Sequence, residues 1–462
     1  MSAINNQLNN IINEINNYLP EERNNIRDHI VTTIYKNAEN IANKVVTQEN
    51  KNINWDRKID SIVTSRLLGL PIMLALLGIV LWLTITGANY PSQLLAAGLF
   101  WIEEQLTHFF QWVGAPDWLH GLLVLGMYRT LAWVVSVMLP PMAIFFPLFT
   151  LFEDLGYLPR VAFNLDGFFK RAGTHGKQCL TMCMGFGCNA AGVTSCRIIE
   201  SPRERLIAIL TNNFVPCNGR FPTLIALATI FMGSLVAKSY SSFAATATVV
   251  IVILIGIAMT LFISWLLSKT LLKGVPSFFT LELPPYRKPQ IGRILIRSLI
   301  DRTIFVLCRA IVVAGPAGAV IWILANVHIE GFSIIAHMAN FFNPLGLRLG
   351  LDGFILMAFI LGFPANEIVL PILIMSYVSA GTMLELDNLE ALRSLLVSHG
   401  WTWTTALSMM LFSLLHYPCG TTILTIFKET KSFKWTVFSV LMPLAVAIIV
   451  TFAVNQILGF LG

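Results

Sequence analysis

The chain has 462 residues, of which 55% are hydrophobic and only 12% are charged. An ordinary soluble domain carries roughly a quarter charged residues, so this composition excludes a simple soluble enzyme and predicts a polytopic membrane protein. The formal net charge of +6 comes from basic residues clustered in particular loops rather than on a face interleaved with aromatic residues, so we expect no nucleic-acid partner. Seven cysteines, an odd number with several inside apolar runs, argue against a secreted disulfide framework.

Residues 1–65 predict cytoplasmic helices ahead of the membrane region. Asparagine is abundant at the start, and apolar residues recur at helical spacing between Ile4 and Leu19. A second amphipathic helix is expected over residues 21–46, with Ile30 and Ile34 on its apolar face. No apolar run stands near the start of the sequence, so we expect no cleavable signal peptide.

The first membrane half is assigned to residues 66–268. Its segment 89–120 contains acidic residues and several Trp and Phe but no Lys or Arg, which predicts an interfacial helix on the external side. Basic residues follow the second span and the first motif described below, so these two loops are expected in the cytoplasm. Four spans are expected, the second of them broken at Pro140 and Pro141: residues 67–88, 122–152, 206–235 and 243–267.

Residues 269–302 form the most basic stretch of the chain and are expected to be a cytoplasmic linker. The second membrane half is assigned to residues 303–462. Its segments 327–352 and 380–400 are poor in Lys and Arg and carry acidic residues, so both are expected outside. The expected spans are residues 304–326, 402–427 and 435–458. This order places the N-terminus in the cytoplasm and the C-terminus outside.

Two short motifs occur once in each half. Met-Gly-Phe-Gly-Cys-Asn at 184–189 is related to Leu-Gly-Phe-Pro-Ala-Asn at 361–366, and each is followed by Pro-Cys, at 216–217 and at 418–419. The asparagines lie 177 residues apart and the second cysteines 202, so the second half should contain an insertion of about 25 residues near 380–400. Both motifs place helix breakers and polar groups inside apolar segments, which the membrane tolerates only beside a cavity or a ligand.

These features predict an all-α, polytopic membrane protein of two inverted halves, with about seven full spans and two re-entrant segments. The first re-entrant segment, 179–196, would enter from the cytoplasm, and the second, within 353–379, from outside. Interrupted segments at corresponding positions of two halves are the best sequence indication of a transport site.

Three cysteines each follow a helix-breaking residue: Cys188, Cys217 and Cys419. Their sulfur atoms, the carbonyl groups freed at the breaks and the side-chain oxygens of Asn189 and Asn366 form a suitable ligand set for a borderline-soft divalent cation. The alternative is that these cysteines pack as small apolar residues, which is what we expect of the other four cysteines.

Glu367 lies inside an otherwise apolar run. An ionisable residue within a membrane segment is a functional candidate, and this one adds a hard oxygen ligand and a compensating negative charge. The alternative is a structural ion pair with Arg309 or with Arg220, which stands beside the first Pro-Cys motif.

The sequence contains no recognisable enzymatic motif. Gly-Thr-His-Gly-Lys-Gln at 173–178 shares only its Gly-Lys pair with a phosphate-binding loop, because it lacks the four-residue gap and the Ser or Thr after the lysine. No other nucleotide-binding, zinc-protease or serine-hydrolase motif occurs. We therefore expect no catalytic residues and no bound cofactor.

In combination, these motifs resemble the membrane region of the ferrous iron transport protein B (FeoB) family. The resemblance covers about residues 60–460 and is carried by Glu153–Phe163, Gly185–Asn189, Pro216–Pro222 and Pro418–Cys419. It implies two Gate-type halves in a bacterial cytoplasmic membrane and uptake of Fe(II). Cys188, Cys217 and Cys419 fall on the family's proposed cysteine pore, and Glu367 on its polar second-gate motif.

One feature departs from the family pattern. FeoB proteins normally begin with a GTPase domain, whereas residues 1–65 resemble at most the last helices of its helical appendage. We therefore expect Fe(II) as substrate, GTP acting only through a separate GTPase subunit, and small accessory Feo-type proteins as further partners, with a homo-oligomer left open. Two rival hypotheses are a Gate-type carrier of a nucleoside or other organic solute, and a metal-binding membrane scaffold or sensor that transports nothing.

Overall fold

The computed structural model describes residues 20–45, 55–65, 67–235, 240–274, 286, 290–292, 296, 298–379, 381–383 and 389–461. The chain divides into two compact units, residues 1–61 and 62–462. In the first unit, α2 (Pro20–Val45) is helical where the second amphipathic helix is predicted, and its Ile30, Ile34 and Ile41 are exposed. The helix predicted between residues 4 and 19 lies outside the described residues. The short helix α3 (Trp55–Val63) contains the boundary between the units.

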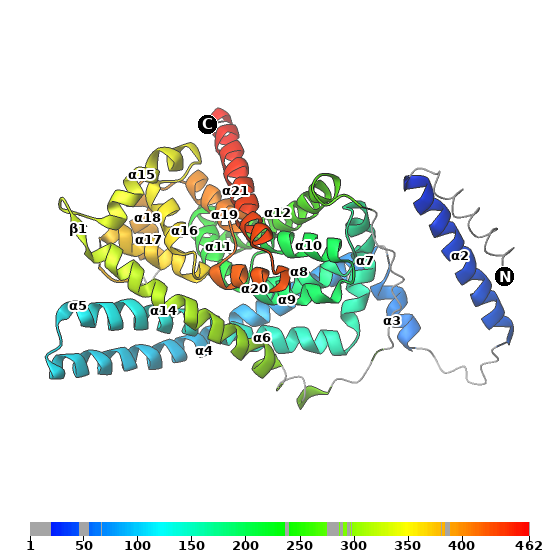
Figure 1. The fold of residues 1–462 in the computed structure, drawn as a ribbon, viewed down its shortest axis with the longest axis horizontal. Helices are drawn as coiled ribbons and strands as arrows, with labels where there is room; N and C mark the ends of the chain where they lie inside the picture. The colour runs from blue at the N-terminus through cyan, green and yellow to red at the C-terminus, as the bar shows by residue number, and fades with distance from the viewer. Residues whose placement is uncertain are drawn as a thin grey trace. The chain divides into compact units, whose positions relative to one another are not determined.

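The second unit is almost entirely helical, which confirms the predicted all-α class. It opens with a long antiparallel hairpin, visible in Figure 1. One arm is α4 (Gly69–Val113), and the other runs through α5 (Asp117–His120), the π-helix η1 (Gly121–Tyr128) and α6 (Arg129–Asp154). At 1.5 Å per residue, the 45 residues of α4 extend roughly 68 Å, more than twice the ~30 Å hydrocarbon thickness of a bilayer.

Two predictions about this hairpin were wrong. No separate interfacial helix begins after residue 88, because α4 continues through that point to Val113. The prolines Pro140 and Pro141 do not break the second span either; both are buried within continuous α6. Neighbouring membrane helices and small backbone adjustments satisfy the groups that proline frees, so proline alone predicts a break poorly in such a setting.

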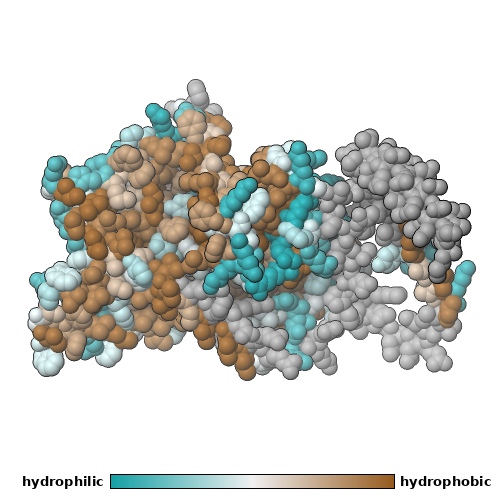
Figure 2. Space-filling view, viewed as in Figure 1, coloured by the Kyte–Doolittle hydropathy of each residue, from teal (hydrophilic) through white to brown (hydrophobic). Residues whose placement is uncertain are grey.

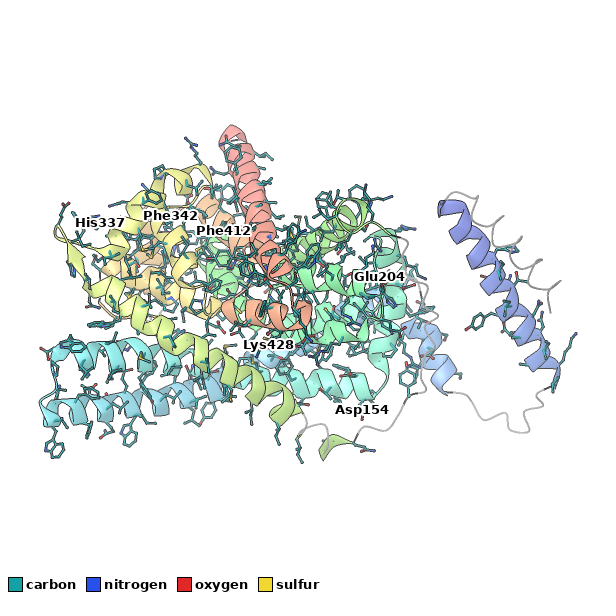
Figure 3. The ribbon with its side chains drawn as sticks, viewed as in Figure 1. Asp154, Glu204, His337, Phe342, Phe412 and Lys428 are labelled. Carbon is teal, nitrogen blue, oxygen red and sulfur yellow. The ribbon has the colours of Figure 1, made fainter. Side chains whose placement is uncertain are left out.

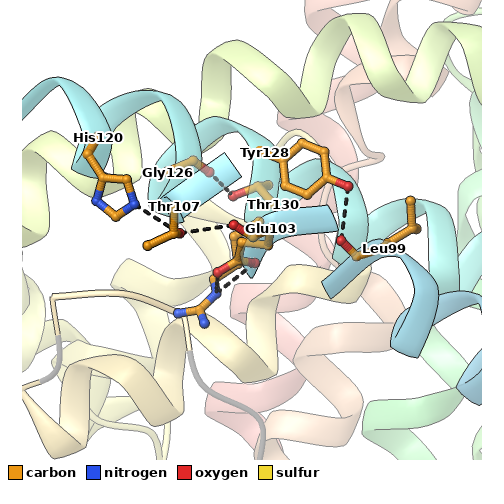
Figure 4. A network of polar contacts seen from close by, with 8 residues as sticks. Leu99, Glu103, Thr107, His120, Gly126, Tyr128 and Thr130 are labelled. Atoms are coloured by element: carbon orange, nitrogen blue, oxygen red, sulfur yellow. Dashed lines mark hydrogen bonds and ion pairs between the residues drawn. The ribbon is translucent and has the colours of Figure 1, made fainter. Parts of the chain in front are cut away.

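A polar network closes the far part of this hairpin (Figure 4). Glu103 of α4 is only 6% exposed and forms an ion pair of 3.1 Å with Arg129 at the start of α6. Thr107 donates to the Glu103 carbonyl at 2.9 Å, and Tyr128 donates to the Leu99 carbonyl at 2.9 Å. The acidic character that the sequence assigns to segment 89–120 is therefore partly neutralised across the hairpin, and the ion pair joins α4 to α6.

The remaining elements of the first half end at α12. They are α7 (Tyr157–Arg171), α8 (Gln178–Gly187), α9 (Asn189–Ser195), η2 (Cys196–Ile198), α10 (Pro202–Thr211), η3 (Asn212–Phe214), η4 (Asn218–Arg220), α11 (Phe221–Leu227), η5 (Ala228–Met232), η6 (Gly233–Leu235) and α12 (Ser241–Lys269). Much of the basic linker 269–302 lies outside the described residues.

The second half repeats this order with additions. Its elements are η8 (Ser298–Ile304), α14 (Phe305–Asn326), the two-stranded antiparallel pair β1 (His328–Ile329) and β2 (Phe332–Ser333), α15 (Ile334–Arg348), α16 (Gly353–Leu361), η9 (Asn366–Ile368), α17 (Val369–Val378), α18 (Leu389–Ser398), α19 (Trp403–Leu415), α20 (Gly420–Thr430) and α21 (Phe433–Leu461). Between the break and the Pro-Cys motif, the first half has one α-helix after α9, whereas the second has both α18 and α19 after α17. The extra helix α18 falls where the insertion is predicted.

Six helical stretches among the described residues are long and apolar enough to cross a membrane: 69–113, 117–154, 202–232, 243–269, 403–430 and 433–459. The bent pair α15–α16, with an angle of 115°, makes up to seven. The remaining predicted span, 304–326, coincides with the 22-residue helix α14. Figure 2 shows apolar residues over most of the visible face of this unit, with hydrophilic residues gathered near the end of α20. The chain is a multi-pass membrane protein.

One apolar core joins the two halves. It includes Leu210 and Leu224 from the first half and Ile355 and Leu414 from the second. Phe412 of α19, labelled in Figure 3, belongs to it, and its ring lies 4.9 Å from that of Phe359 on α16. The two halves therefore fold as one body rather than as separate domains.

Gly318 of α14 permits a close helix contact outside the site. A Cβ at this position would stand 2.4 Å from the Gly126 carbonyl of η1 and 2.4 Å from the Thr130 hydroxyl. Small residues let membrane helices approach in this way. We expect Gly318→Ala to lower the melting temperature of the purified protein by several degrees, since roughly 1–3 kcal/mol is the usual cost of overpacking.

Gly315 supplies the matched control on the same helix. A Cβ there would meet Leu131 at 3.6 Å, an ordinary contact, so Gly315→Ala should be neutral or slightly stabilising. Equal melting temperatures for the two variants would contradict the close approach of α14 to η1.

Candidate metal pathway at two broken helices

The first break lies between α8 and α9. Cys188 there is extended, with φ −155° and ψ 125°, and its neighbours on both sides are helical. Gly187 is required by close packing, because a Cβ would stand 2.4 Å from the ring of Phe145. Gly185 and Gly192 both face the Asn212 amide, which would lie 3.0 and 2.5 Å from their Cβ positions. The glycines therefore let a polar side chain and an aromatic ring reach the backbone of the break.

The second break lies between α16 and η9 and repeats this geometry. Ala365 has φ −152° and ψ 125°, within a few degrees of Cys188, and each is followed by the asparagine of its motif. The Pro-Cys motifs also match: Cys217 precedes η4 with φ −81° and ψ 168°, and Cys419 precedes α20 with φ −63° and ψ 159°. The sequence repeat thus corresponds to a repeat of backbone structure.

Each break packs against the Pro-Cys segment of the other half. Helix α9 contacts α20, and η4 contacts η9. Within the second half, the backbone N–H of Gly420 donates to the Phe363 carbonyl at 2.8 Å, so this break also contacts its own Pro-Cys segment. The contacts between the halves join residues that lie roughly 150 to 240 positions apart in the sequence.

All six predicted site residues line one cavity of about 30 Å³ between the two halves. They are Cys188, Asn189, Cys217, Asn366, Glu367 and Cys419. Since one water-sized sphere needs roughly 10–15 Å³, the cavity accommodates a single largely dehydrated ion or one to two waters. Sequence reasoning missed the other lining residues, which include Met138 and Met142 of α6 and Thr421 of α20.

The polar groups around the cavity are close to one another. The Asn366 amide nitrogen lies 3.8 Å from the Cys217 sulfur, and the Cys419 sulfur lies 3.3 Å from the Thr422 hydroxyl. The Glu367 carboxylate lies against Gly219, where a Cβ would meet its carboxyl carbon at 2.8 Å. In the described part of the chain, no three His, Cys, Asp or Glu side chains stand close enough together to hold one ion among themselves.

Asn189 is bonded to the backbone of its own half. With its amide oriented so that nitrogen faces the acceptors, it donates to the carbonyls of Gly185 and Val215, each at 3.2 Å. This ties the first break to the segment that leads into Cys217.

Arg220, which the sequence offers only as an alternative ion-pair partner for Glu367, bonds to backbone carbonyls instead. Its side chain is 1% exposed, and its guanidinium donates to backbone carbonyls at 2.7–3.4 Å. The accepting residues are Asn213, Leu414, His416 and Tyr417. The ion pairs found among the described residues do not include Glu367 with Arg220, and the side chain of Arg309 lies outside the described set. Arg220 instead joins the two halves beside Cys217.

Of the other four cysteines, some pack as small apolar residues, as expected. Cys179 and Cys196 are buried in apolar clusters, whereas Cys308 is exposed on α14. All seven cysteines are free thiols. His416, which the sequence places three residues before Cys419, directs its ring toward Phe359 and the Phe412 and Ser413 carbonyls, away from the cavity.

The molecule consists of two repeated halves, and each half has a helix broken at the same point. The halves meet around a buried cavity lined by sulfur and oxygen atoms. This is an α-helical multi-pass membrane protein of the repeat class that transporters use. Comparison with known proteins identifies the family. The family described as "Nucleoside recognition" (Gate) matches residues 135–231 and 307–433, and that described as "Ferrous iron transport protein B C terminus" matches residues 249–301. The chain belongs to the FeoB family.

Individual relatives support this assignment. The "Fe(2+) transporter FeoB" of Staphylococcus aureus (strain MSSA476) is 30% identical over 97% of this chain and 68% of the relative. The protein of the same name from Methanocaldococcus jannaschii is 24% identical over 99% of this chain and 67% of the relative. A "Fe(2+) transport protein A/Fe(2+) transporter FeoB fusion protein" of Porphyromonas gingivalis is 28% identical over 87% of this chain and 51% of its own length. No solved structure matches.

Proposed function

We propose that this chain carries Fe(II) across the bacterial cytoplasmic membrane along a pathway through the cavity between the two broken helices. The observation that carries the proposal is the meeting of Cys188, Cys217, Cys419 and Glu367, drawn from both halves, around one buried cavity. The relatives from Staphylococcus aureus and Methanocaldococcus jannaschii are both named Fe(2+) transporters, which supports iron as the cargo.

The cavity offers ligands that replace the water molecules a ferrous ion loses when it enters. Thiol sulfur suits a borderline-soft metal, and the asparagine and carbonyl oxygens suit the harder part of its character. Glu367 contributes a negative charge at a place otherwise expensive for a cation. Several partial ligands along a path allow an ion both to enter and to leave, as conduction requires.

Gating is proposed to come from a separate GTP-binding subunit. The motivating observation is the apolar face that Ile30, Ile34 and Ile41 expose on α2, which suits docking of a partner. The fusion named in Porphyromonas gingivalis supports small accessory proteins as further partners. The proposal includes a cytoplasmic N-terminus and an external C-terminus. GTP should change iron uptake only after the partner is added; an effect of GTP on the 462-residue chain alone would contradict it.

Uptake into proteoliposomes tests the pathway. Purified chain should admit Fe(II), and Cys217→Ser should lower the initial rate about tenfold, which corresponds to roughly 1.4 kcal/mol of lost stabilisation of the ion in transit. Cys308→Ser, which changes an exposed cysteine outside the cavity, serves as the matched control and should keep the full rate.

The same assay separates the rival functions. Equal rates for Cys217→Ser and Cys308→Ser would reject the cysteine pathway. Uptake of a labelled nucleoside that ignores all three cavity cysteines would favour the organic-solute carrier. Binding of Fe(II) without flux would favour a membrane scaffold or sensor.

A further inference from the structure

A second and larger cavity lies behind the first break. Its volume is about 250 Å³, it is open on one side, and α4, α6, α7, α8 and α12 form its walls. Leu77 of α4, Phe145 of α6, Val161 of α7, Cys183 of α8 and Leu261 of α12 represent its five walls. The side chains that line it are apolar apart from the phenol of Tyr157 and two cysteine thiols.

A cavity with this volume and this lining is expected to be neither empty nor filled with water. Protein interiors pack at high density, and an empty space of this size forfeits the dispersion contacts of every group that lines it. A buried water needs two to four polar partners, which this lining does not provide. Apolar cavities of smaller volume stay dry and accept apolar ligands. The chemistry of the walls therefore requires an apolar occupant.

Exposed apolar side chains lie at the edge of the cavity. Leu70 and Leu74 of α4, each 41% exposed, and Phe168 of α7, 51% exposed, lie at its edge. Helix α4 is apolar enough to span a membrane, so these exposed apolar side chains suit contact with acyl chains. An unbranched hydrocarbon chain fits the apolar chemistry of the site.

The basic residues of helix α7 indicate which class of lipid the cavity binds. Its apolar face lines the cavity, and its last turn carries two exposed basic residues: Arg171, and Lys170, which forms an ion pair of 2.7 Å with Asp166. An amphipathic helix of this kind lies at the membrane interface, where basic residues attract anionic headgroups. We propose that this cavity binds one acyl chain of an anionic phospholipid whose headgroup lies beside the C-terminal turn of α7.

The occupant would support the first break directly. Phe145 and Phe186 form part of the cavity wall, and the Phe145 ring is also the group that packs on Gly187, next to Cys188. Gly187 and Cys188 line the small cavity on the other side. A single aromatic layer thus separates the acyl chain from the ion pathway. This link to transport rests on the proposed function, whereas the lipid site itself does not.

Photolabelling in nanodiscs tests the site. The chain is reconstituted in phosphatidylcholine containing a small fraction of phosphatidylglycerol with a diazirine in mid-chain, and adducts are mapped by mass spectrometry. We expect adducts on α8 at Cys179–Phe186. Leu77→Trp and Leu261→Trp, which fill the cavity from opposite walls, should each lower the α8 adduct yield at least about fivefold. Ile251→Trp, on a 56% exposed position of α12 outside the cavity, is the matched control and should leave it unchanged.

The outcomes are distinct. An α8 yield in the unmodified chain no higher than the yield on the exposed face of α12 would overturn the site, as would a yield that neither filling variant reduces. Equal yields from diazirine phosphatidylcholine would overturn the anionic headgroup, and labelling by a diazirine fatty acid alone would overturn a phospholipid as the source. Labelling uses no metal, so its failure would leave the iron pathway intact, and failure of iron uptake would leave the lipid site intact.

Discussion

Replacing Arg220 with methionine should leave little correctly folded protein. The guanidinium donates to carbonyls of Asn213, Leu414, His416 and Tyr417, all beside breaks where the helix cannot supply donors. The His416 carbonyl keeps the Asn213 amide as a donor at 2.6 Å, so up to three carbonyls lose theirs. Each buried carbonyl left without a donor costs about 1–3 kcal/mol, and three of them approach the whole stability of about 5–15 kcal/mol of a typical protein. We expect the melting temperature in detergent to fall by at least about 10 °C.

A matched variant separates this effect from the loss of any arginine. Arg393 is exposed on α18, so Arg393→Met should keep the melting temperature of the unmodified chain. Arg220→Lys keeps the charge but loses the planar fork of donors, and should fall between the two. A fully stable Arg220→Met would show that the two halves are not held together by this side chain.

Replacing Glu367 with glutamine should lower Fe(II) uptake about tenfold or more while the fold is retained. The carboxylate is only 9% exposed, lines the small cavity and lies against the backbone of Gly219. Glutamine has nearly the same size but no charge, and a full charge near a divalent ion at an effective dielectric constant of about 20 is worth several kcal/mol, well beyond the ~1.4 kcal/mol of a tenfold change. Initial rates in proteoliposomes measure this, with the exposed Glu104→Gln as control.

A substitution at Gly219 tests the role of the same carboxylate independently. A Cβ there would stand 2.8 Å from the carboxyl carbon of Glu367, so Gly219→Ala should displace the carboxylate and lower uptake as well. Because both changes act through one group, the double variant should be little worse than Glu367→Gln alone. Additive losses would mean that the two residues act separately and that the carboxylate is not held at the cavity.

Much of the site could be predicted because the relevant signals are local. Gly185 and Gly187 in one half and Gly362 and Pro364 in the other mark the breaks directly, since they interrupt apolar runs that would otherwise form single helices. Because each break motif is followed by a Pro-Cys motif in both halves, the repeat also marked the Pro-Cys segments as parts of the site. Because a membrane tolerates freed backbone groups only beside a cavity or a ligand, the two breaks indicated one buried site.

The remaining features depend on tertiary contacts. The aromatic residues of segment 89–120 suit an interfacial helix and the continuation of α4 equally well, so their composition did not reveal the length of that helix. Pro140 and Pro141 remain helical because α6 is supported by neighbouring helices. The role of Arg220 follows from counting unsatisfied carbonyls, and those become visible only when residues 414–417 are found beside it. The apolar cavity behind α8 has five walls from distant segments, and no sequence pattern predicts it.

The most direct test of the proposed pathway is anomalous diffraction at the iron edge from crystals of the reduced chain soaked with Fe(II) under anaerobic conditions. We predict that the strongest peak lies in the cavity between the two breaks, in contact with at least one of Cys188, Cys217 and Cys419, and that Cys217→Ser weakens it. Iron found only at surface carboxylates, with this cavity empty at concentrations that support uptake, would contradict the pathway.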